Sequence, residues 1–293
     1  MKFPIVSFHG GSGAGAINDL IAFPAGEPAY ELLSTATPSA VVHPLKELRK
    51  FLLDQPGEHL YVANGSKDLN QVLRFGPPVE EGKQWRYECV YASRGLSHPF
   101  DLVWGFGGAL FVSNQDTNEV TSFDSQGAEG AKFASGFKAV RGLAYDGSRL
   151  YVADSGDDRI RAFDADGNEV GHAKAKQPVH LLWDADHGWL LIGSEADDSV
   201  LAWNPSTSAE PATLVAKTEP AIDRTAGLAL APGKGKTATL FVASRLGRQV
   251  LSFPLDFSSG APVWSPKTTE IFLHKHQLGD NPEFVGFFGL PYG

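Results

Sequence analysis

The sequence of 293 residues is poor in cysteine and has no long apolar run. Because Cys89 is the only cysteine, no disulfide can form within the chain and no zinc site can be thiolate-based. No apolar run approaches the roughly 20 residues of a membrane-spanning helix, and the opening MKFPIVSFHGGSG has no adequate signal-peptide core. We therefore expect a cytoplasmic protein without membrane contact.

Clusters of basic residues are also missing. The chain has 25 Lys and Arg against 34 Asp and Glu, for a formal net charge of −9, and no segment concentrates the positive charge. Nucleic-acid binding needs clustered Lys and Arg to neutralise phosphates, so we expect no nucleic-acid partner. A monomer that binds a small molecule is the expectation.

Sustained helical periodicity is absent, and a strand–turn–strand unit recurs in its place. The clearest copy, LYVADSGDDRIRAF, begins at Leu150. Related copies begin at Leu60, Leu110, Leu190 and Leu240, and a degenerate copy begins at Pro4. Every copy ends in an aromatic residue, which we expect to pack between neighbouring repeats: Phe23, Phe75, Phe123, Phe163, Trp203 and Phe253.

Each repeat of about 40–50 residues accommodates four strands, which is typical of a propeller blade. Residues 46–53 (KELRKFLL) suit a short helix or an innermost strand, and their place in the repeat favours the strand. The C-terminal segment 281–289 resembles a first strand, which the N-terminal repeat lacks, so it should close the ring.

The predicted fold is an all-β, six-bladed β-propeller with four antiparallel strands per blade, in a single domain 1–293. The predicted blade cores are 4–34, 48–92, 100–135, 140–175, 179–216 and 225–274, with the closing strand at 282–289.

The repeat LYVADSGDDRIRAFD resembles the NHL-repeat class of six-bladed propellers. Similar propellers include streptogramin-lyase-like enzymes, peptidyl-hydroxyglycine amidating lyases and non-catalytic interaction modules. The resemblance implies an architecture over nearly the whole chain, but a fold of this kind does not determine its chemistry.

The first strand of every blade lines the central channel of a propeller. Aligned by apolar pattern, these strands place four polar residues in one column, together with Ala226 and Val285: Arg49, Asp101, Arg141 and His180. The two arginines suit an anionic group, His180 suits proton transfer, and Asp101 suits the orientation of either. These four are the predicted catalytic residues, and the alternative is a solvated channel with a structural Asp101–Arg141 ion pair.

A second polar set lies around the same mouth, mostly in the turns that follow the second strands. As predicted ligand-binding residues we take His9, Asn64, His98, Asn114, Asp154, Glu195 and Arg245. Oxygen ligands among them suit Ca²⁺ or Mg²⁺, and the imidazoles of His9, His43, His98 and His180 suit Zn²⁺. Since Asn and Asp also stabilise turns, and no close zinc spacing occurs, we assign no metal ligand and leave the cofactor undetermined.

These observations favour a small-molecule-binding propeller, with a lyase or hydrolase activity on an anionic or polar substrate at the channel mouth. The alternative is a non-catalytic scaffold that binds a peptide or protein. An exposed apolar patch would favour the scaffold.

Overall fold

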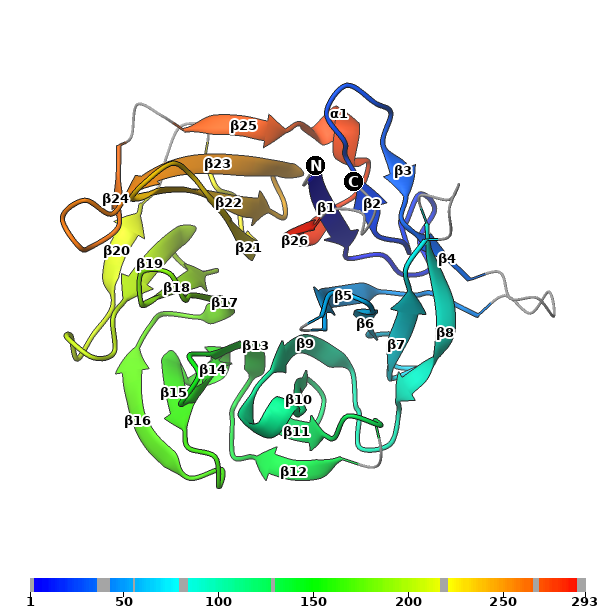
Figure 1. Ribbon diagram of the computed structural model, residues 1–293, viewed down its shortest axis with the longest axis horizontal. Coiled ribbons are helices and arrows are strands. Elements are labelled where there is room, and N and C mark those ends of the chain that lie inside the picture. The colour runs from blue at the N-terminus through cyan, green and yellow to red at the C-terminus, as the bar shows by residue number, and fades with distance from the viewer. Residues whose placement is uncertain are drawn as a thin grey trace.

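The computed structural model describes residues 3–35, 43–54, 56–78, 84–127, 130–216, 221–265 and 269–288. Six β-sheets stand around a central axis, and each sheet runs from an inner strand at the axis to an outer strand at the rim (Figure 1). The predicted six-bladed β-propeller is thereby confirmed.

Blade 4 shows the pattern in its simplest form. From the axis outward it contains β13 (Val140–Tyr145), β14 (Leu150–Asp154), β15 (Arg159–Phe163) and β16 (Glu169–Lys174), all antiparallel. Every residue of β14 is buried, because both of its faces pack against neighbouring blades, whereas β16 is almost entirely exposed. The short 3₁₀ turn η2 (Ser155–Asp157) joins β14 to β15.

The other blades repeat this order with local additions. Blade 2 contains β5 (Leu48–Leu53), β6 (Leu60–Asn64), β7 (Gln71–Gly76) and β8 (Trp85–Ala92), with β4 (Leu33–Ser34) parallel to β8. Blade 3 contains β9 (Pro99–Trp104), the 3₁₀ turn η1 (Phe106–Gly108), β10 (Leu110–Asn114), β11 (Glu119–Phe123) and β12 (Ala131–Ala134). Blade 5 contains β17 (Pro178–Asp184), β18 (Trp189–Ser194), β19 (Ser199–Trp203) and β20 (Ala212–Val215). The strand expected over residues 46–53 is confirmed as β5.

Blade 6 has a divided outer edge. It contains β21 (Thr225–Pro232), β22 (Thr237–Ser244) and β23 (Gln249–Asp256). Both β24 (Val263–Trp264) and β25 (Glu270–Leu273) pair with β23, which is long enough to hold two short partners. The short helix α1 (Lys275–Leu278) follows and leads to the last strand.

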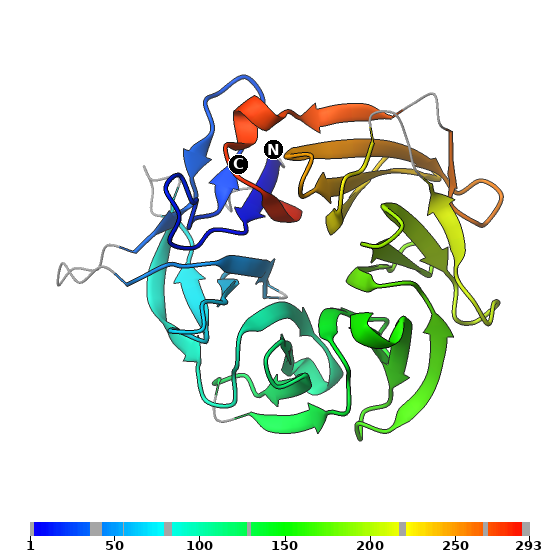
Figure 2. The same cartoon turned by 180° about the vertical axis from the view of Figure 1, so that it is seen from behind.

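Both ends of the chain build blade 1. The last strand, β26 (Pro282–Phe288), pairs antiparallel with β1 (Phe3–Phe8), and β2 (Ile21–Ala22) and β3 (Tyr30–Glu31) continue the sheet. The first and last strands, β1 and β26, lie side by side at this blade in both views (Figures 1 and 2). The predicted ring closure is confirmed over 282–288, and Gly289 lies outside the described residues. In the described part of the chain, no helix has the length and apolarity to cross a membrane.

The core is divided among the six interfaces between blades. Six hydrophobic clusters occupy these interfaces, and each contains one of the predicted aromatic residues. In the order of the interfaces from blades 1/2 to 6/1 they are Phe75, Phe123, Phe163, Trp203, Phe253 and Phe23. All six are at most 8% exposed, so the predicted packing role is confirmed.

A repeated hydrogen bond ties each of blades 1 to 5 to the blade that follows it, at the mouth of the channel. The side-chain oxygen of one Asn or Asp accepts from a backbone N–H at the head of the following inner strand, at 2.5–3.1 Å. The acceptors are Asn18, Asn70, Asn118, Asp158 and Asp198. Four of them have positive φ, which Asn and Asp tolerate better than other side chains do.

Candidate functional site

All six inner strands carry a bulge at the same place. The bulge determines which residues of the six strands lie at the same depth in the channel, and we call each such set of six a level. Val140 pairs with Asp154 and Leu143 with Val152, so three steps on β13 match two steps on β14. The same irregularity occurs in the other five inner strands. The outermost level therefore contains Arg49, Phe100, Arg141, Val179, Ala226 and Glu283.

This register corrects the column predicted from the apolar pattern. Asp101 and His180 lie one residue deeper than Arg49 and Arg141, in a level with Lys50, Gly142, Gly227 and Phe284. The pattern failed because it matched Phe100 to Val140, whereas the hairpins match Pro99 to Val140. The predicted four-residue column is thus divided between two levels.

Aromatic rings from both levels meet at the axis of the channel. The His180 ring lies 4.6 Å from the Phe284 ring and 5.3 Å from the Phe100 ring, and these two phenyl rings lie 5.3 Å apart. Three blades on different sides of the ring therefore meet at the axis. The close approach of inner strands needs glycine here, since a Cβ on Gly142 would lie 2.6 Å from the Val179 carbonyl oxygen.

His180 is enclosed by this aromatic plug. It is 2% exposed, and neither ring nitrogen has a hydrogen-bond partner among the described residues. Burial lowers the pKa of its imidazole to about 3, an effect that the Glu283 carboxylate only partly opposes. A neutral imidazole of such low basicity is poorly suited to proton transfer near neutral pH.

Asp101 ties two blades together. Its carboxylate accepts from the backbone N–H of Leu102 at 2.8 Å and from that of Leu143 in the next blade at 2.9 Å. Burial raises the pKa of this carboxyl, while Lys50, whose Nζ lies 3.9 Å away, lowers it. The expected contact with His180 or Arg141 does not occur in the described structure.

At the mouth, a buried carboxylate gathers three basic side chains from three blades. Oε2 of Glu283 lies 3.4 Å from His9 Nδ1, 3.6 Å from Arg49 Nη1 and 3.5 Å from Arg245 Nε. Arg49 Nη1 also contacts His9 Nδ1 at 2.8 Å.

Glu283 is the residue that sequence reasoning missed. Burial opposes its ionisation, but His9, Arg49 and Arg245 outweigh burial and lower the pKa of the carboxyl to about 2. A signal for it was present in the sequence. Pro99, Pro178 and Pro282 hold the same register position at the heads of their inner strands, which places Glu283 level with Arg49.

Charged contacts continue from this cluster along the rim. Glu47 Oε2 lies 3.6 Å from Arg49 Nη2 and 3.9 Å from His98 Nε2. His98 Nδ1 lies 3.2 Å from Asp116. The structure therefore brings together His9, Arg49, His98 and Arg245 of the predicted site, in one arc over blades 1, 2, 3 and 6.

Arg141 faces this arc from blade 4. Its one described hydrogen bond to the protein goes from Nη1 to the Val140 carbonyl oxygen at 2.9 Å. Burial lowers the pKa of the guanidinium, and the charges of Glu195, Glu283, Arg49 and Arg245 all act on it. No carboxylate of the described residues lies within 4 Å of Arg141.

The remaining predicted ligand-binding residues hold the loops at the mouth in place through hydrogen bonds and an ion pair. Oxygens of Asn64, Asn114 and Asp154 accept backbone N–H groups at 2.9–3.0 Å, and all three residues are buried. Glu195 pairs with Arg224 at the rim. Asn64, Asn114 and Asp154 therefore stabilise turns, the alternative that the sequence left open for Asn and Asp. The described residues contain no group of three or more His, Cys, Asp or Glu suited to a metal ion.

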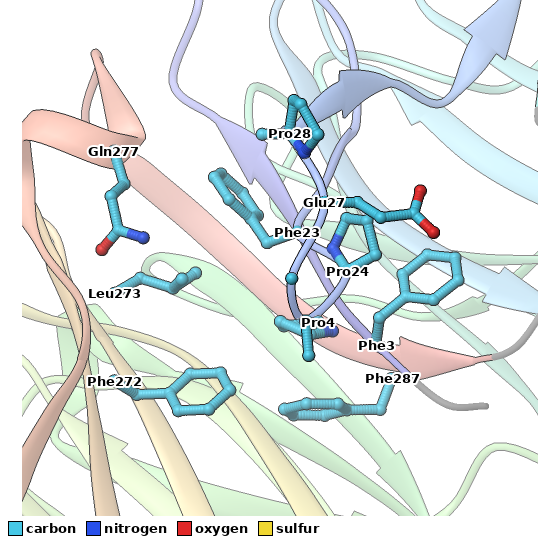
Figure 3. Close-up of a pocket in the computed structure, with 13 residues that line it drawn as sticks. Phe3, Pro4, Phe23, Pro24, Glu27, Pro28, Phe272, Leu273, Gln277 and Phe287 are labelled. Carbon is cyan, nitrogen blue, oxygen red and sulfur yellow. The ribbon is translucent and has the colours of Figure 1, made fainter.

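A hollow of about 610 Å³ lies away from the mouth. It is at the closure of the ring, where blade 1 meets the outer edge of blade 6. Figure 3 shows Phe3, Phe23, Phe272 and Phe287 around it, with Glu27 and Gln277 among its polar residues. Its apolar walls hold no cluster of titratable groups, so it is not a candidate catalytic centre.

Comparison with known proteins supports the fold alone. No protein-family model matches the sequence, and no curated protein matches it. Among solved structures, a chain of the nidogen–laminin complex has a TM-score of 0.68 at 13% identity, with 98% of each chain covered. A Bacteroides fragilis protein described as a candidate 6-phosphogluconolactonase has a TM-score of 0.67 at 16% identity, again with 98% of each chain covered. Virginiamycin B lyase from Staphylococcus aureus has a TM-score of 0.59 at 13% identity and covers 91% of this chain and 80% of its own.

Proposed function

We propose that this propeller binds a small molecule carrying a carboxylate or phosphate group, at the channel mouth between Arg141 and the arc around Glu283. The observation that carries the proposal is the guanidinium of Arg141. Arg49, Arg224 and Arg245 each have a carboxylate within 4 Å, whereas Arg141 has none among the described residues. A half-buried cation without a counter-ion is a ready partner for an anionic group.

The surroundings of Arg141 support an anion over a cation. Its guanidinium carbon lies 6.0 Å from the centre of the Phe100 ring, which forms part of the aromatic floor. An anion above this floor would face Arg141 on one side and Arg245 and His9 on the other. His9 leaves 43% of its side chain exposed, and its Nδ1 and Nε2 lie 3.1 and 3.4 Å from Arg245 Nη2.

A lyase or hydrolase activity is the finer part of the proposal. Elimination and hydrolysis both need a proton carrier that reaches the substrate. His180 lies within the aromatic plug, so His9 takes its place in the proposal as the imidazole that meets the ligand. Some propellers of similar fold are enzymes, which is consistent with catalysis at this face.

The scaffold alternative is favoured by the apolar hollow at the ring closure. Phe272 is 38% exposed there and lies 6.2 Å from the Phe287 ring. Apolar surface of this kind suits a peptide or protein partner more than it suits a charged small molecule.

The proposal is tested by titration of the protein with inorganic phosphate and with citrate, followed by calorimetry and by thermal melting. We expect both anions to bind the parent protein, and we expect Arg141→Ala to weaken binding at least tenfold, about 1.4 kcal/mol. Arg86→Ala is the matched control, because Arg86 is exposed on the outer strand β8, remote from the mouth. Equal affinity in the parent and Arg141→Ala would reject the site, and no binding of either anion would favour the scaffold.

A further inference from the structure

A second hollow, of about 570 Å³, lies on the face opposite the mouth. The inner strands run from the mouth toward this face, where β5, β9 and β13 end at Leu53, Trp104 and Tyr145. Its volume is within the range of ligand sites. The lining comprises Asp54, Tyr61, Trp104, Gly105, Gly108, Ser125 and Tyr145.

Aromatic side chains in fixed orientations form the walls. The Tyr61 and Trp104 rings lie 5.0 Å apart at 89°, so together they make a right-angled corner. The indole is held by a hydrogen bond from its Nε1 to the Leu53 carbonyl oxygen at 2.9 Å. Tyr145 packs edge-on against Phe106 and donates its hydroxyl hydrogen to the Gly147 carbonyl oxygen at 2.8 Å.

A carboxylate in a fixed position stands beside these rings. Asp54 accepts from the backbone N–H groups of Glu58 and His59 at 2.8 and 3.1 Å, and from His59 Nδ1 at 2.8 Å. Burial acts to raise the pKa of Asp54, but the hydrogen bonds from His59 and Glu58 outweigh it and lower the pKa. The carboxylate therefore stays charged at neutral pH.

His59, whose Nδ1 lies 2.8 Å from Asp54 Oδ2, is the basic neighbour of this carboxylate. The lining residues themselves include no Lys or Arg. Gly105 and Gly108 complete the lining, and a Cβ on Gly105 would lie 2.7 Å from the Phe111 ring, so packing requires glycine at that position. The site thus combines π faces, one negative charge and room for a compact group.

We propose that this hollow binds an organic cation, an alkylated ammonium head group, between the Tyr61–Trp104 corner and Tyr145, with Asp54 as the counter-charge. The faces of aromatic rings attract cations electrostatically, and Trp does so most strongly. A quaternary ammonium group has no hydrogen to donate and loses little hydration, so rings and one nearby carboxylate are sufficient to hold it. Asp54 would repel an anion and attract an organic cation.

The test compares choline with its neutral isostere, 3,3-dimethyl-1-butanol, by calorimetry. We expect choline to bind and the neutral isostere to bind at least tenfold more weakly. Equal affinity for both molecules would overturn the proposal, since it would show that the hollow recognises shape and apolarity but not charge.

Two matched substitutions at Tyr145 distinguish loss of the aromatic ring from loss of the folded structure. Tyr145→Phe keeps a ring and should keep choline affinity within about twofold, whereas Tyr145→Leu should lose at least fivefold, by the range of measured cation–π energies. Asp54→Asn should lose choline affinity while leaving the isostere unchanged. Thermal melting of each variant confirms that it is folded, and Trp104→Leu serves as a second wall variant in case Tyr145→Leu is unstable. Retention of choline binding by both wall variants would refute the site.

This proposal is independent of the channel mouth. Arg141→Ala should bind choline as the parent does, because Arg141 lies on the opposite face. Loss of choline binding in Arg141→Ala would contradict the assignment to this hollow.

Discussion

Asp19 is a carboxyl group in surroundings that disfavour its charge. It is 9% exposed, and its Oδ1 accepts from the backbone N–H groups of Leu20 at 2.7 Å and Leu33 at 3.1 Å. Burial raises the pKa of Asp19 to about 7, the Glu31 carboxylate adds to the rise, and the two backbone hydrogen bonds oppose it only in part. Such a group couples the stability of blade 1 to pH.

Asp19 should make the free energy of unfolding depend on pH. The pKa of Asp19 in the folded protein is about 7, above its ordinary value of 3.8, so the native state binds the proton more tightly than the unfolded state does. The contribution of Asp19 to the free energy of unfolding should fall as pH rises from about 4 to about 7, by a few kcal/mol at roughly 1.4 kcal/mol per pKa unit. Asp19→Asn should remove that fall, as measured by urea unfolding between pH 4.5 and 8.

The control for this experiment is Asp186→Asn, at an exposed aspartate between β17 and β18 of blade 5. It should keep the pH dependence of the parent. If Asp19→Asn and the parent show the same slope, the raised pKa of Asp19 is wrong.

At the scale of the element, the aromatic residue at the end of each third strand holds its blade against the preceding one. Phe163, at the end of β15, is 2% exposed in the cluster between blades 3 and 4. Its ring meets the Phe137 ring at 5.7 Å and the Phe133 ring at 6.3 Å, both edge-on. Removing the ring would leave a cavity that two rigid sheets cannot close.

Phe163→Ala should therefore lower the free energy of unfolding by about 3–5 kcal/mol. Phe163→Leu, which keeps most of the volume, should cost less. Phe272→Ala is the comparison, because its exposed ring should cost less than about 1 kcal/mol. Denaturant unfolding with an unchanged m-value measures all three, and a cost for Phe163→Ala equal to that for Phe272→Ala would contradict the packing argument.

The bulge in each inner strand shows the limit of periodicity as a guide. Apolar pattern and place in the repeat together identified the inner strands, and place in the repeat alone decided β5, whose sequence also suits a helix. It was insufficient to align them, because a bulge inserts one residue that follows no period. As a result, Asp101 and His180 were expected at the level of Arg49 and Arg141, and Glu283 was not expected there at all.

At the scale of the whole molecule, ring closure and the candidate site share one residue. Glu283 lies on the closing strand β26 and contacts His9 of blade 1, Arg49 of blade 2 and Arg245 of blade 6. Its pKa in the folded protein is about 2, below the ordinary 4.5, so its contribution to stability is complete above pH 4.5 and is lost as pH falls through 2. The carboxylate thus stabilises the closed ring at neutral pH.

Glu283→Gln should lower the free energy of unfolding by about 3–5 kcal/mol at pH 7, because it leaves Arg49, whose side chain is 4% exposed, with a weaker set of partners. The variant should also lose less stability than the parent on acidification below pH 4.5. Glu270→Gln, at an exposed position on β25, provides the control and should match the parent in both respects. Urea unfolding at pH 7 and at pH 3 measures the difference, and a parent-like Glu283→Gln would show that the ion pairs at the closure add no stability.

The sequence by itself determined the number of blades, the closure by both chain ends and the aromatic residue at each interface. All three follow from local features that a linear chain displays directly, namely strand alternation, turn residues and a repeat of 40–50 residues. Only the tertiary structure decided which charged residues meet. His9 and Arg245 are 236 residues apart in the chain yet lie in hydrogen-bond contact, and Asp101 and His180 turn away from the mouth because the bulge shifts their level. Contacts across the axis depend on the register of all six inner strands at once, and no local pattern contains that information.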